Sequence, residues 1–161
     1  LARRNVEARM LLVGRVDEES PDHLSAQELE TWAAEGAVEW VGHRSDMSRV
    51  IRDSNIIALP TAYGEGVPRI LIEAAASARP IVTTDIPGCD DIVRDGINGI
   101  LIPPKDSIAL AAALERLISD EELRRTMGSH GRALVEREFD VSAVVEQTMR
   151  VYEELSAEIS G

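Results

Sequence analysis

The stretch Glu65-Gly66-Val67-Pro68-Arg69-Ile70-Leu71-Ile72-Glu73 decides the fold class of this 161-residue chain. It follows the apolar run Ile56-Ile57-Ala58-Leu59, which is typical of a buried strand, and it leads into Ala74-Ala75-Ala76, which favours a helix. Two carboxylates, Glu65 and Glu73, therefore flank a strand-to-helix turn. We expect Pro68 at the first helical position, which places Glu73 about a turn and a half into the helix. Open α/β sheets bind ligands at such turns, outside the carboxyl ends of their strands.

Further strands and helices alternate along the chain. Apolar runs predict strands at residues 10–13, 38–41, 55–59, 80–84 and 99–102. Helices are expected from Ser25 to Gly36, Ser45 or Asp46 to Arg52, Pro68 to Arg79, Asp90 to Arg94, from Asp106 or Ser107 onward, at 121–127 and 130–138, and at about 141–156. This alternation predicts an α/β fold with a Rossmann-like, doubly wound parallel sheet, in a single domain covering residues 1–161.

Composition excludes several classes of protein. The chain is 44% hydrophobic, so we expect a globular domain, and its net charge of −12 disfavours nucleic-acid and anionic-membrane partners. The single cysteine, Cys89, fits a reducing, cytoplasmic compartment. No apolar stretch is long enough to span a bilayer. Because the chain begins at Leu1 without a methionine or a signal-peptide pattern, we interpret it as a fragment of a longer protein.

The loop before Pro68 has the features of an anion site. Gly64 and Gly66 allow close approach of a ligand to the backbone, and free amides at a helix start attract phosphate. Glu73 could then accept two ribose hydroxyls. The competing interpretation is that Glu65 is an ordinary acid near a helix start and Glu73 a solvated helix residue. On spacing alone this second interpretation is favoured, because two acids near one helix are common.

Other residues at the same predicted edge carry weaker signals. Gly14 follows the first strand, and Gly42-His43-Arg44 follows the second. Asp90 and Asp91 are expected to be helix-capping acids, and Cys89 has no histidine partner that would make it a nucleophile. No His, Cys or carboxylate spacing matches a metal site, so we predict that no metal is tightly bound.

The residues from Ala58 to Val82 resemble the signature of retaining glycosyltransferases of the GT-B fold, the group 1 or family 4 class. The run Gly96-Ile97-Asn98-Gly99-Ile100-Leu101-Ile102-Pro103 is similar to a second signature of that family. The resemblance extends from about Ala8 to Phe139. It implies that this chain is the C-terminal, donor-binding domain of a two-domain enzyme, whose N-terminal domain binds the acceptor.

The resemblance also implies roles for individual residues. Glu65 would be the catalytic residue, contacting the hydroxyls of the donor sugar and facing the reacting carbon. The remaining donor-binding residues would be Gly66, Val67 and Pro68 along the sugar and diphosphate, Glu73 at the ribose, Gly42, His43 and Arg44 at the base, and Gly14 near the diphosphate.

The activity implied is transfer of a hexose or N-acetylhexosamine with retention and without a metal cofactor. The Glu-Gly-Val-Pro-Arg variant at 65–69 resembles bacterial enzymes that act on lipid-linked saccharides, so the donor is expected to be a UDP-sugar. This places the protein in lipopolysaccharide or surface-polysaccharide biosynthesis, in the cytoplasm or peripherally on the inner membrane face. The chain alone is expected to be inactive, because a reaction in an interdomain cleft needs both walls.

Two alternative functions stay open: a non-catalytic nucleotide-binding α/β module, and one half of a sugar-nucleotide epimerase. The chain also departs from the family pattern, with Val16 and Ala78 in place of glycines and Asp91 in place of a glutamate. The final helix, at about 141–156, has a broad apolar face. We expect this face to be covered by the same domain, by a missing domain or by a second copy in a homo-oligomer.

Overall fold

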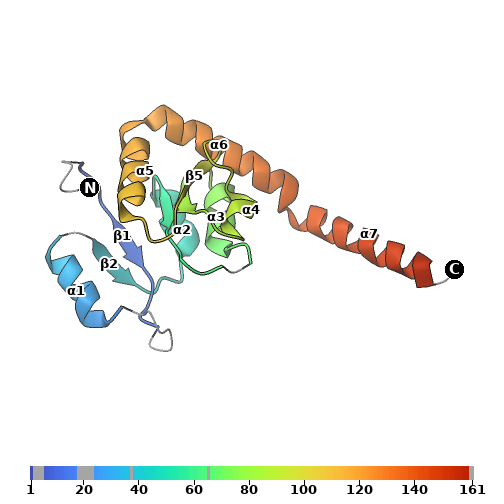
Figure 1. The fold of residues 1–161 in the computed structure, drawn as a ribbon, viewed down its shortest axis with the longest axis horizontal. Helices are drawn as coiled ribbons and strands as arrows, with labels where there is room; N and C mark the ends of the chain where they lie inside the picture. The colour runs from blue at the N-terminus through green and yellow to red at the C-terminus, as the bar shows by residue number, and fades with distance from the viewer. Residues whose placement is uncertain (2–5, 18–23, 37, 65, 160–161) are drawn as a thin grey trace. The chain divides into compact units, whose positions relative to one another are not determined.

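The computed structural model describes residues 1, 6–17, 24–36, 38–64 and 66–159, which form two compact units, Leu1–Val50 and Ile51–Gly161 (Figure 1). Each unit has a parallel sheet of its own, β1-β2 in the first and β3-β4-β5 in the second. The predicted alternation of strands and helices is confirmed, and each strand begins within two residues of its predicted start. The strands hydrogen-bond as two separate sheets. The sequence does not predict this division, because an apolar pattern identifies a strand without identifying its neighbour. The single-domain organisation of residues 1–161 stays a prediction.

The first unit holds a β–α–β arrangement. Strand β1 (Leu11–Val13) pairs in parallel with β2 (Glu39–Gly42), and α1 (Ala26–Ala34) lies between them in the sequence. Helix α1 begins with a capping box: the Glu28 amide donates to Ser25 Oγ at 3.3 Å, and the Ser25 amide donates to Glu28 Oε2 at 2.9 Å. Helix α2 (Met47–Asp53) lies at the boundary between the two units.

The sheet of the second unit is covered on both faces. Its strands are β3 (Ile57–Leu59), β4 (Ile81–Thr84) and β5 (Gly99–Ile102), all parallel, with β4 buried at every position. Side chains alternate across a strand. Ile81 therefore faces α3 (Arg69–Ala76) and the main core, whereas Thr84 faces α5 (Ser107–Ser119). The core on the α3 side consists of Leu71, Ala74, Ala75, Ile81, Cys89, Ile92, Val93, Leu134 and Val135.

Helix α3 starts one residue later than the sequence suggests. Pro68 is the N-cap, with φ −63° and ψ 122°, so the prediction that it is the first helical residue is wrong. The extended ψ keeps Pro68 outside the helix, and Glu73 becomes the fifth helical residue. At the other end, Ala78 takes φ 53°, and the amides of Ala78 and Arg79 donate to the carbonyls of Ala75 and Ala74. This is a Schellman ending that usually contains glycine.

Helix α6 (Glu121–Glu138) is continuous, although two separate helical stretches were expected. The interruption was expected around Gly128, whose presence is explained by packing. A Cβ built at Gly128 would lie 2.8 Å from the carbonyl carbon of Ala78. Gly128 and Gly131 are both buried, and α6 packs closely against α3 through them. Asp106 caps α5 as predicted, accepting from the Ile108 and Ala109 amides.

The residues of the turn from Asp95 to Gly99 have structural roles within the chain. Asp95 Oδ1 accepts from the Leu101 amide at 2.9 Å, and Gly96 has φ 73°. Asn98 is buried, with its side chain donating to the Ile92 carbonyl at 2.8 Å and accepting from the Arg94 amide at 2.7 Å. A Cβ at Gly99 would lie 2.9 Å from Val93 Cγ1 and against the Ile81 backbone. Residues of the second signature, at 96–103, therefore stabilise the fold of this unit through their own hydrogen bonds and packing.

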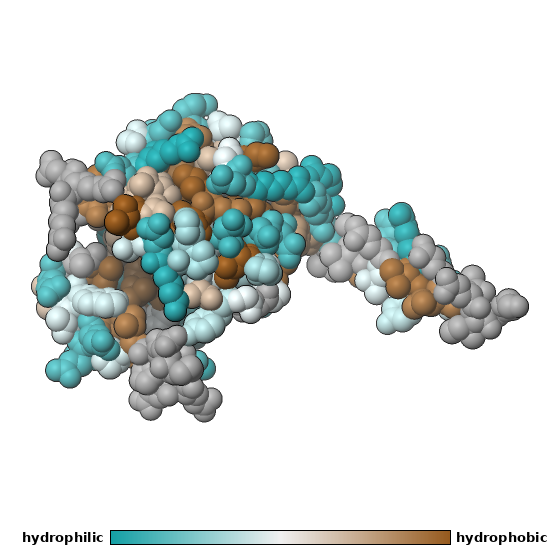
Figure 2. All heavy atoms as spheres, in the orientation of Figure 1, coloured by the Kyte–Doolittle hydropathy of each residue, from teal (hydrophilic) through white to brown (hydrophobic). Residues whose placement is uncertain are grey.

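The last helix, α7 (Val141–Ile159), exposes apolar side chains. Figure 2 shows brown, apolar atoms among polar ones along its described part. These residues are Val145, Met149, Val151, Tyr152 and Leu155, each at least half exposed. Homo-oligomer formation through this helix stays a prediction. Within the residues described, no helix combines the length and apolar character required to cross a membrane.

Candidate functional site

The loop that follows β3 is anchored by two threonines of the neighbouring strand. Thr83 Oγ1 donates to the Leu59 carbonyl at 2.8 Å, and Thr84 Oγ1 donates to the Thr61 carbonyl at 2.5 Å. Both threonine side chains belong to residues with no exposed surface. Their hydroxyls therefore hold the start of this loop against the carboxyl end of β4, and the loop can present its remaining backbone to a ligand.

The loop then enters α3 through the predicted donor-binding residues. Gly66 is exposed, Val67 packs against the core on the α3 side, and Pro68 is buried. The Leu71 amide donates to the Pro68 carbonyl at 2.9 Å, which closes the first turn of α3. Core packing at Val67 and Pro68 thus fixes the backbone on the C-terminal side of Gly66. Glu65, the predicted catalytic residue, lies outside the described residues.

Glu73 is partly exposed and already engaged by a cation. Its Oε1 accepts from Arg69 Nε at 2.7 Å across one helical turn, with 34% of the Glu73 side chain and 90% of the Arg69 side chain exposed. Such surface pairs contribute little to stability, about 0.3–0.5 kcal/mol. Arg69 uses one nitrogen and contacts Oε1, so within the described residues the second carboxylate oxygen of Glu73 accepts no hydrogen bond from it.

In the first unit, Gly14 and Gly42 are brought together at the ends of β1 and β2. The Gly14 amide donates to the Gly42 carbonyl at 3.0 Å, and Trp40 Nε1 donates to the Gly14 carbonyl at 3.0 Å. Gly42 has φ 66° and Gly14 has φ 150°, both in the left-handed half of the backbone map, which favours glycine. The two glycines form one edge, as expected from parallel pairing.

Arg44 is held by a neighbouring acid, whereas His43 is exposed. Arg44 Nε and Nη2 donate to Asp46 Oδ1 and Oδ2 at 2.8 and 2.7 Å. The hydrogen bonds from Arg44 lower the pKa of the Asp46 carboxyl below its usual range, more than the small desolvation raises it. The guanidinium is thereby oriented, and a ligand that uses it has to share it with Asp46.

The structure thus places the predicted residues in two local groups, one in each unit: Gly14, Gly42, His43 and Arg44 in the first, and Gly66, Val67, Pro68 and Glu73 in the second. Their roles stay predictions. Sequence reasoning missed Thr83 and Thr84, whose only signal is two hydroxyl residues at the end of an otherwise apolar strand.

The remaining candidates are structural in character. Cys89 is buried in the core, with its Sγ 3.3 Å from Thr83 Oγ1, to which the thiol can donate. Asp90 and Asp91 are exposed first-turn residues of α4 (Cys89–Ile92), whose N-cap is Gly88 without a side-chain cap, so the prediction that these acids cap the helix is wrong. Across the part of the chain that the structure describes, no three His, Cys, Asp or Glu side chains cluster as a metal site. Metal independence stays a prediction.

The chain is similar to known proteins in both sequence and structure. The family described as glycosyl transferases group 1 matches residues 1–120. The chain is 35% identical over 147 residues, 91% of its length, to a phosphatidyl-myo-inositol mannosyltransferase of Mycobacterium leprae. It is 34% identical over 75% of its length to the capsular polysaccharide biosynthesis glycosyltransferase CapM of Staphylococcus aureus. It spans only 38% and 32% of these two relatives.

Solved structures give the same fold. Anabaena HepE in complex with UDP matches 92% of the chain at a TM-score of 0.78 and 26% identity, and the match covers 41% of that protein. The C-terminal domain of the group 1 glycosyl transferase LpcC of Francisella tularensis matches 71% of the chain at a TM-score of 0.62 and 27% identity. The match covers 62% of that domain.

Proposed function

This chain belongs to the group 1 family of glycosyltransferases, and we propose that it forms the donor-binding half of a retaining enzyme that uses a nucleotide sugar. The observation that carries the proposal is its likeness to HepE, which was solved with UDP. The local geometry supports it, because Gly66 and the start of α3 follow the carboxyl end of β3, where α/β sheets bind nucleotides.

In this proposal each described residue has a defined task. Backbone groups near Gly66 approach the diphosphate, and the second carboxylate oxygen of Glu73 accepts ribose hydroxyls. The Thr83 and Thr84 hydroxyls keep the loop in place, so it needs little rearrangement when charge develops on the leaving diphosphate. Glu65 contacts the donor sugar, and Gly14, Gly42, His43 and Arg44 serve the base and diphosphate. No metal is needed, because amides and basic groups neutralise the leaving group.

We propose a UDP-sugar as donor, with a hexose or N-acetylhexosamine transferred to a lipid-linked saccharide. The support comes from relatives. One is the phosphatidyl-myo-inositol mannosyltransferase, and another, 29% identical over 91% of the chain, is the Campylobacter jejuni N-acetylgalactosaminyltransferase acting on N,N'-diacetylbacillosaminyl-diphospho-undecaprenol. Both names describe an acceptor in which a saccharide or polyol is attached to a lipid. The proposed setting is surface-polysaccharide biosynthesis at the inner membrane face, with the acceptor bound by an N-terminal domain.

The first experiment is thermal unfolding of the chain with UDP, GDP, ADP and several UDP-sugars. A ligand at about 100 times its Kd stabilises by roughly 2.7 kcal/mol. At about 2–4 °C per kcal/mol, UDP should raise the midpoint by about 5 °C or more. Glu73→Ala should abolish this shift.

The matched control is Glu136→Ala in α6. Glu136 pairs with Arg132 Nε at 2.6 Å in the same one-turn arrangement as Glu73 with Arg69, so both substitutions remove an equivalent surface ion pair. Glu136→Ala should leave the UDP response intact. If the full-length protein that contains this chain is stabilised by no nucleotide or nucleotide sugar, the proposed function is wrong.

A further inference from the structure

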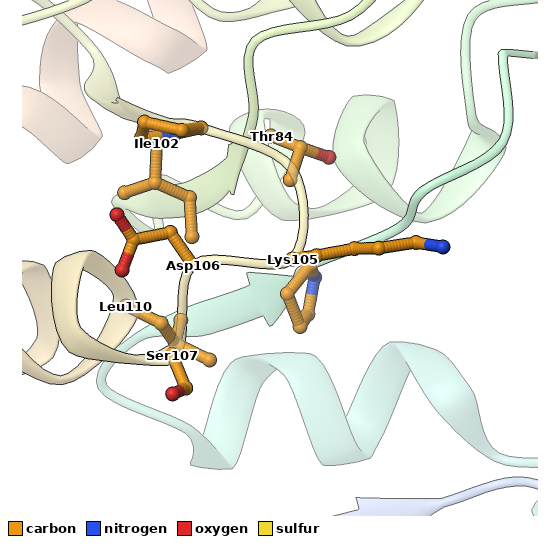
Figure 3. A pocket seen from close by; sticks show the side chains of 8 residues that line it. Thr84, Ile102, Lys105, Asp106, Ser107 and Leu110 are labelled. Carbon is orange, nitrogen blue, oxygen red and sulfur yellow. The ribbon is translucent and has the colours of Figure 1, made fainter.

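A small hollow lies at the carboxyl edge of the sheet in the second unit, on the α5 side (Figure 3). Four segments meet there: the residue after β3, the end of β4, the end of β5 with the loop that follows it, and the start of α5. The lining residues are Pro60, Thr84, Ile102, Pro103, Lys105, Asp106, Ser107 and Leu110. Pro60 begins the same loop that leads to Gly66, so the hollow adjoins the proposed donor site in the chain.

The size of the hollow limits its occupant. Its volume is about 180 Å³. Pockets for drug-sized ligands have about 300–1,000 Å³. The hollow therefore suits a single ring or a similar group and is too small for a whole nucleotide sugar. Its walls at Pro60, Ile102 and Leu110 are apolar, which suits the C–H face of a sugar ring.

A cation stands at the rim. Lys105 is the only lysine in the sequence, and its side chain extends outward from the hollow in Figure 3. It is exposed, and no carboxylate among the described residues forms an ion pair with it. Some arginines of the same unit are held by acids, as in the pairs Arg69–Glu73 and Arg94–Glu138, whereas Arg79 and Arg124 donate to backbone carbonyls. In a chain of net charge −12, an unpaired ammonium at the ligand edge favours an anion.

The acid beside this lysine uses one of its two oxygens to cap a helix. Asp106 Oδ1 accepts from the amides of Ile108 and Ala109 at 3.0 and 2.8 Å, so its carboxylate caps α5. Thr84 likewise donates its hydroxyl to the Thr61 carbonyl. Among the lining side chains Lys105 carries the positive charge, and its long side chain can reach over the opening.

We propose that the hollow takes the ring of a sugar phosphate and that Lys105 contacts the phosphate. This proposal rests on the proposed function, because both the nucleotide-sugar donor and a diphosphate-linked acceptor contain a sugar phosphate. Lys105 acts here as a binding residue for the anion.

The single lysine allows a direct test on the unaltered chain. Reductive methylation with ¹³C-formaldehyde keeps the positive charge and labels only Lys105 and the α-amine. The spectrum of Lys105→Gln, which lacks one of the two signals, identifies the Lys105 methyl signal. Glucose 1-phosphate and UDP-glucose should move the Lys105 methyl signal, whereas glucose should not. A Lys105 signal that responds to neither phosphorylated ligand overturns the inference.

Variants add a measure of affinity. Lys105→Gln should weaken glucose 1-phosphate binding about tenfold, the effect of losing one charge-assisted contact, and Lys105→Arg should restore most of it. Arg116→Gln is the matched control, since Arg116 is exposed in the last turn of α5 and does not line the hollow. If Arg116→Gln weakens binding as much as Lys105→Gln does, the effect is general charge and the inference is wrong.

Competition separates the two sources of the sugar phosphate. Displacement of glucose 1-phosphate by UDP-glucose assigns the hollow to the donor, and joint binding of both assigns it to the acceptor side. The proposed function fails if no nucleotide or nucleotide sugar stabilises the full-length protein. The inference alone fails if UDP still stabilises the wild-type chain while Lys105→Gln leaves the affinities for glucose 1-phosphate and UDP-glucose unchanged.

Discussion

Gly128 is the position at which α6 comes closest to the end of α3, so Gly128→Ala tests this packing. The added Cβ would lie 2.8 Å from the Ala78 carbonyl carbon and closer still to its oxygen. Both atoms are backbone, so one helix has to move. Overpacking costs typically about 1–3 kcal/mol, and a backbone clash lies at the upper end. Alanine contributes about 1 kcal/mol as the better helix former. We expect a net loss of about 2 kcal/mol.

The matched variant is Gly131→Ala, one helical turn away. Its Cβ would lie 3.4 Å from Ala75 Cβ, which is ordinary van der Waals contact, so the helix-forming gain of up to about 1 kcal/mol remains. Thermal and urea unfolding, monitored by circular dichroism, measure the stability of both variants. The midpoint should fall by about 4–8 °C for Gly128→Ala and rise by up to about 4 °C for Gly131→Ala. Equal effects of the two substitutions would refute the close approach at Gly128.

Three further predictions concern stability and charge. Asn98→Ala should lower the free energy of unfolding by about 2–3 kcal/mol in urea, because two buried backbone groups lose their partner; an unchanged urea midpoint would contradict this. Ala78→Gly should raise the free energy of unfolding by about 0.5–1 kcal/mol, because glycine removes the strain of the left-handed conformation at a smaller cost in unfolded-chain entropy. A lower free energy of unfolding would show that φ 53° is unstrained at Ala78. Arg44→Gln should raise the pKa of Asp46 in a carboxyl NMR titration, and Arg49→Gln should raise it less. Because the pKa of Asp46 is lowered in the folded state, its stabilising effect is present above about pH 4 and is lost as the pH falls through the folded-state pKa. Arg44→Gln should make this loss of stability smaller.

The individual helices and strands can be predicted from the sequence, because residues close together in the chain determine them. The Ser25 capping box, the Asp106 cap and the strand positions follow from neighbouring residues alone. Pro68 illustrates the limit: its fixed φ suits both an N-cap and a first helical residue, and only ψ distinguishes them. The pairing of the five strands as two sheets is also invisible to periodicity, since partners are distant in sequence.

The candidate site is readable only in part for the same reason. Gly66 and Glu73 stand out because they are a few residues apart around one turn. Thr83 and Thr84 bond to carbonyls more than twenty residues away, so their anchoring role needs coordinates. Gly128 was interpreted as an interruption of a helix, whereas it marks a contact with α3, because a glycine's own sequence neighbours do not reveal what approaches it.

The turn from Asp95 to Gly99 has a consequence for how genomes are annotated. Each of its hydrogen bonds and close contacts serves the chain itself, so natural selection for a stable domain is enough to preserve it. A paralogue that had lost Glu73 and every catalytic ability would still keep this turn. Searches that weight this turn heavily will therefore recruit inactive descendants along with active enzymes.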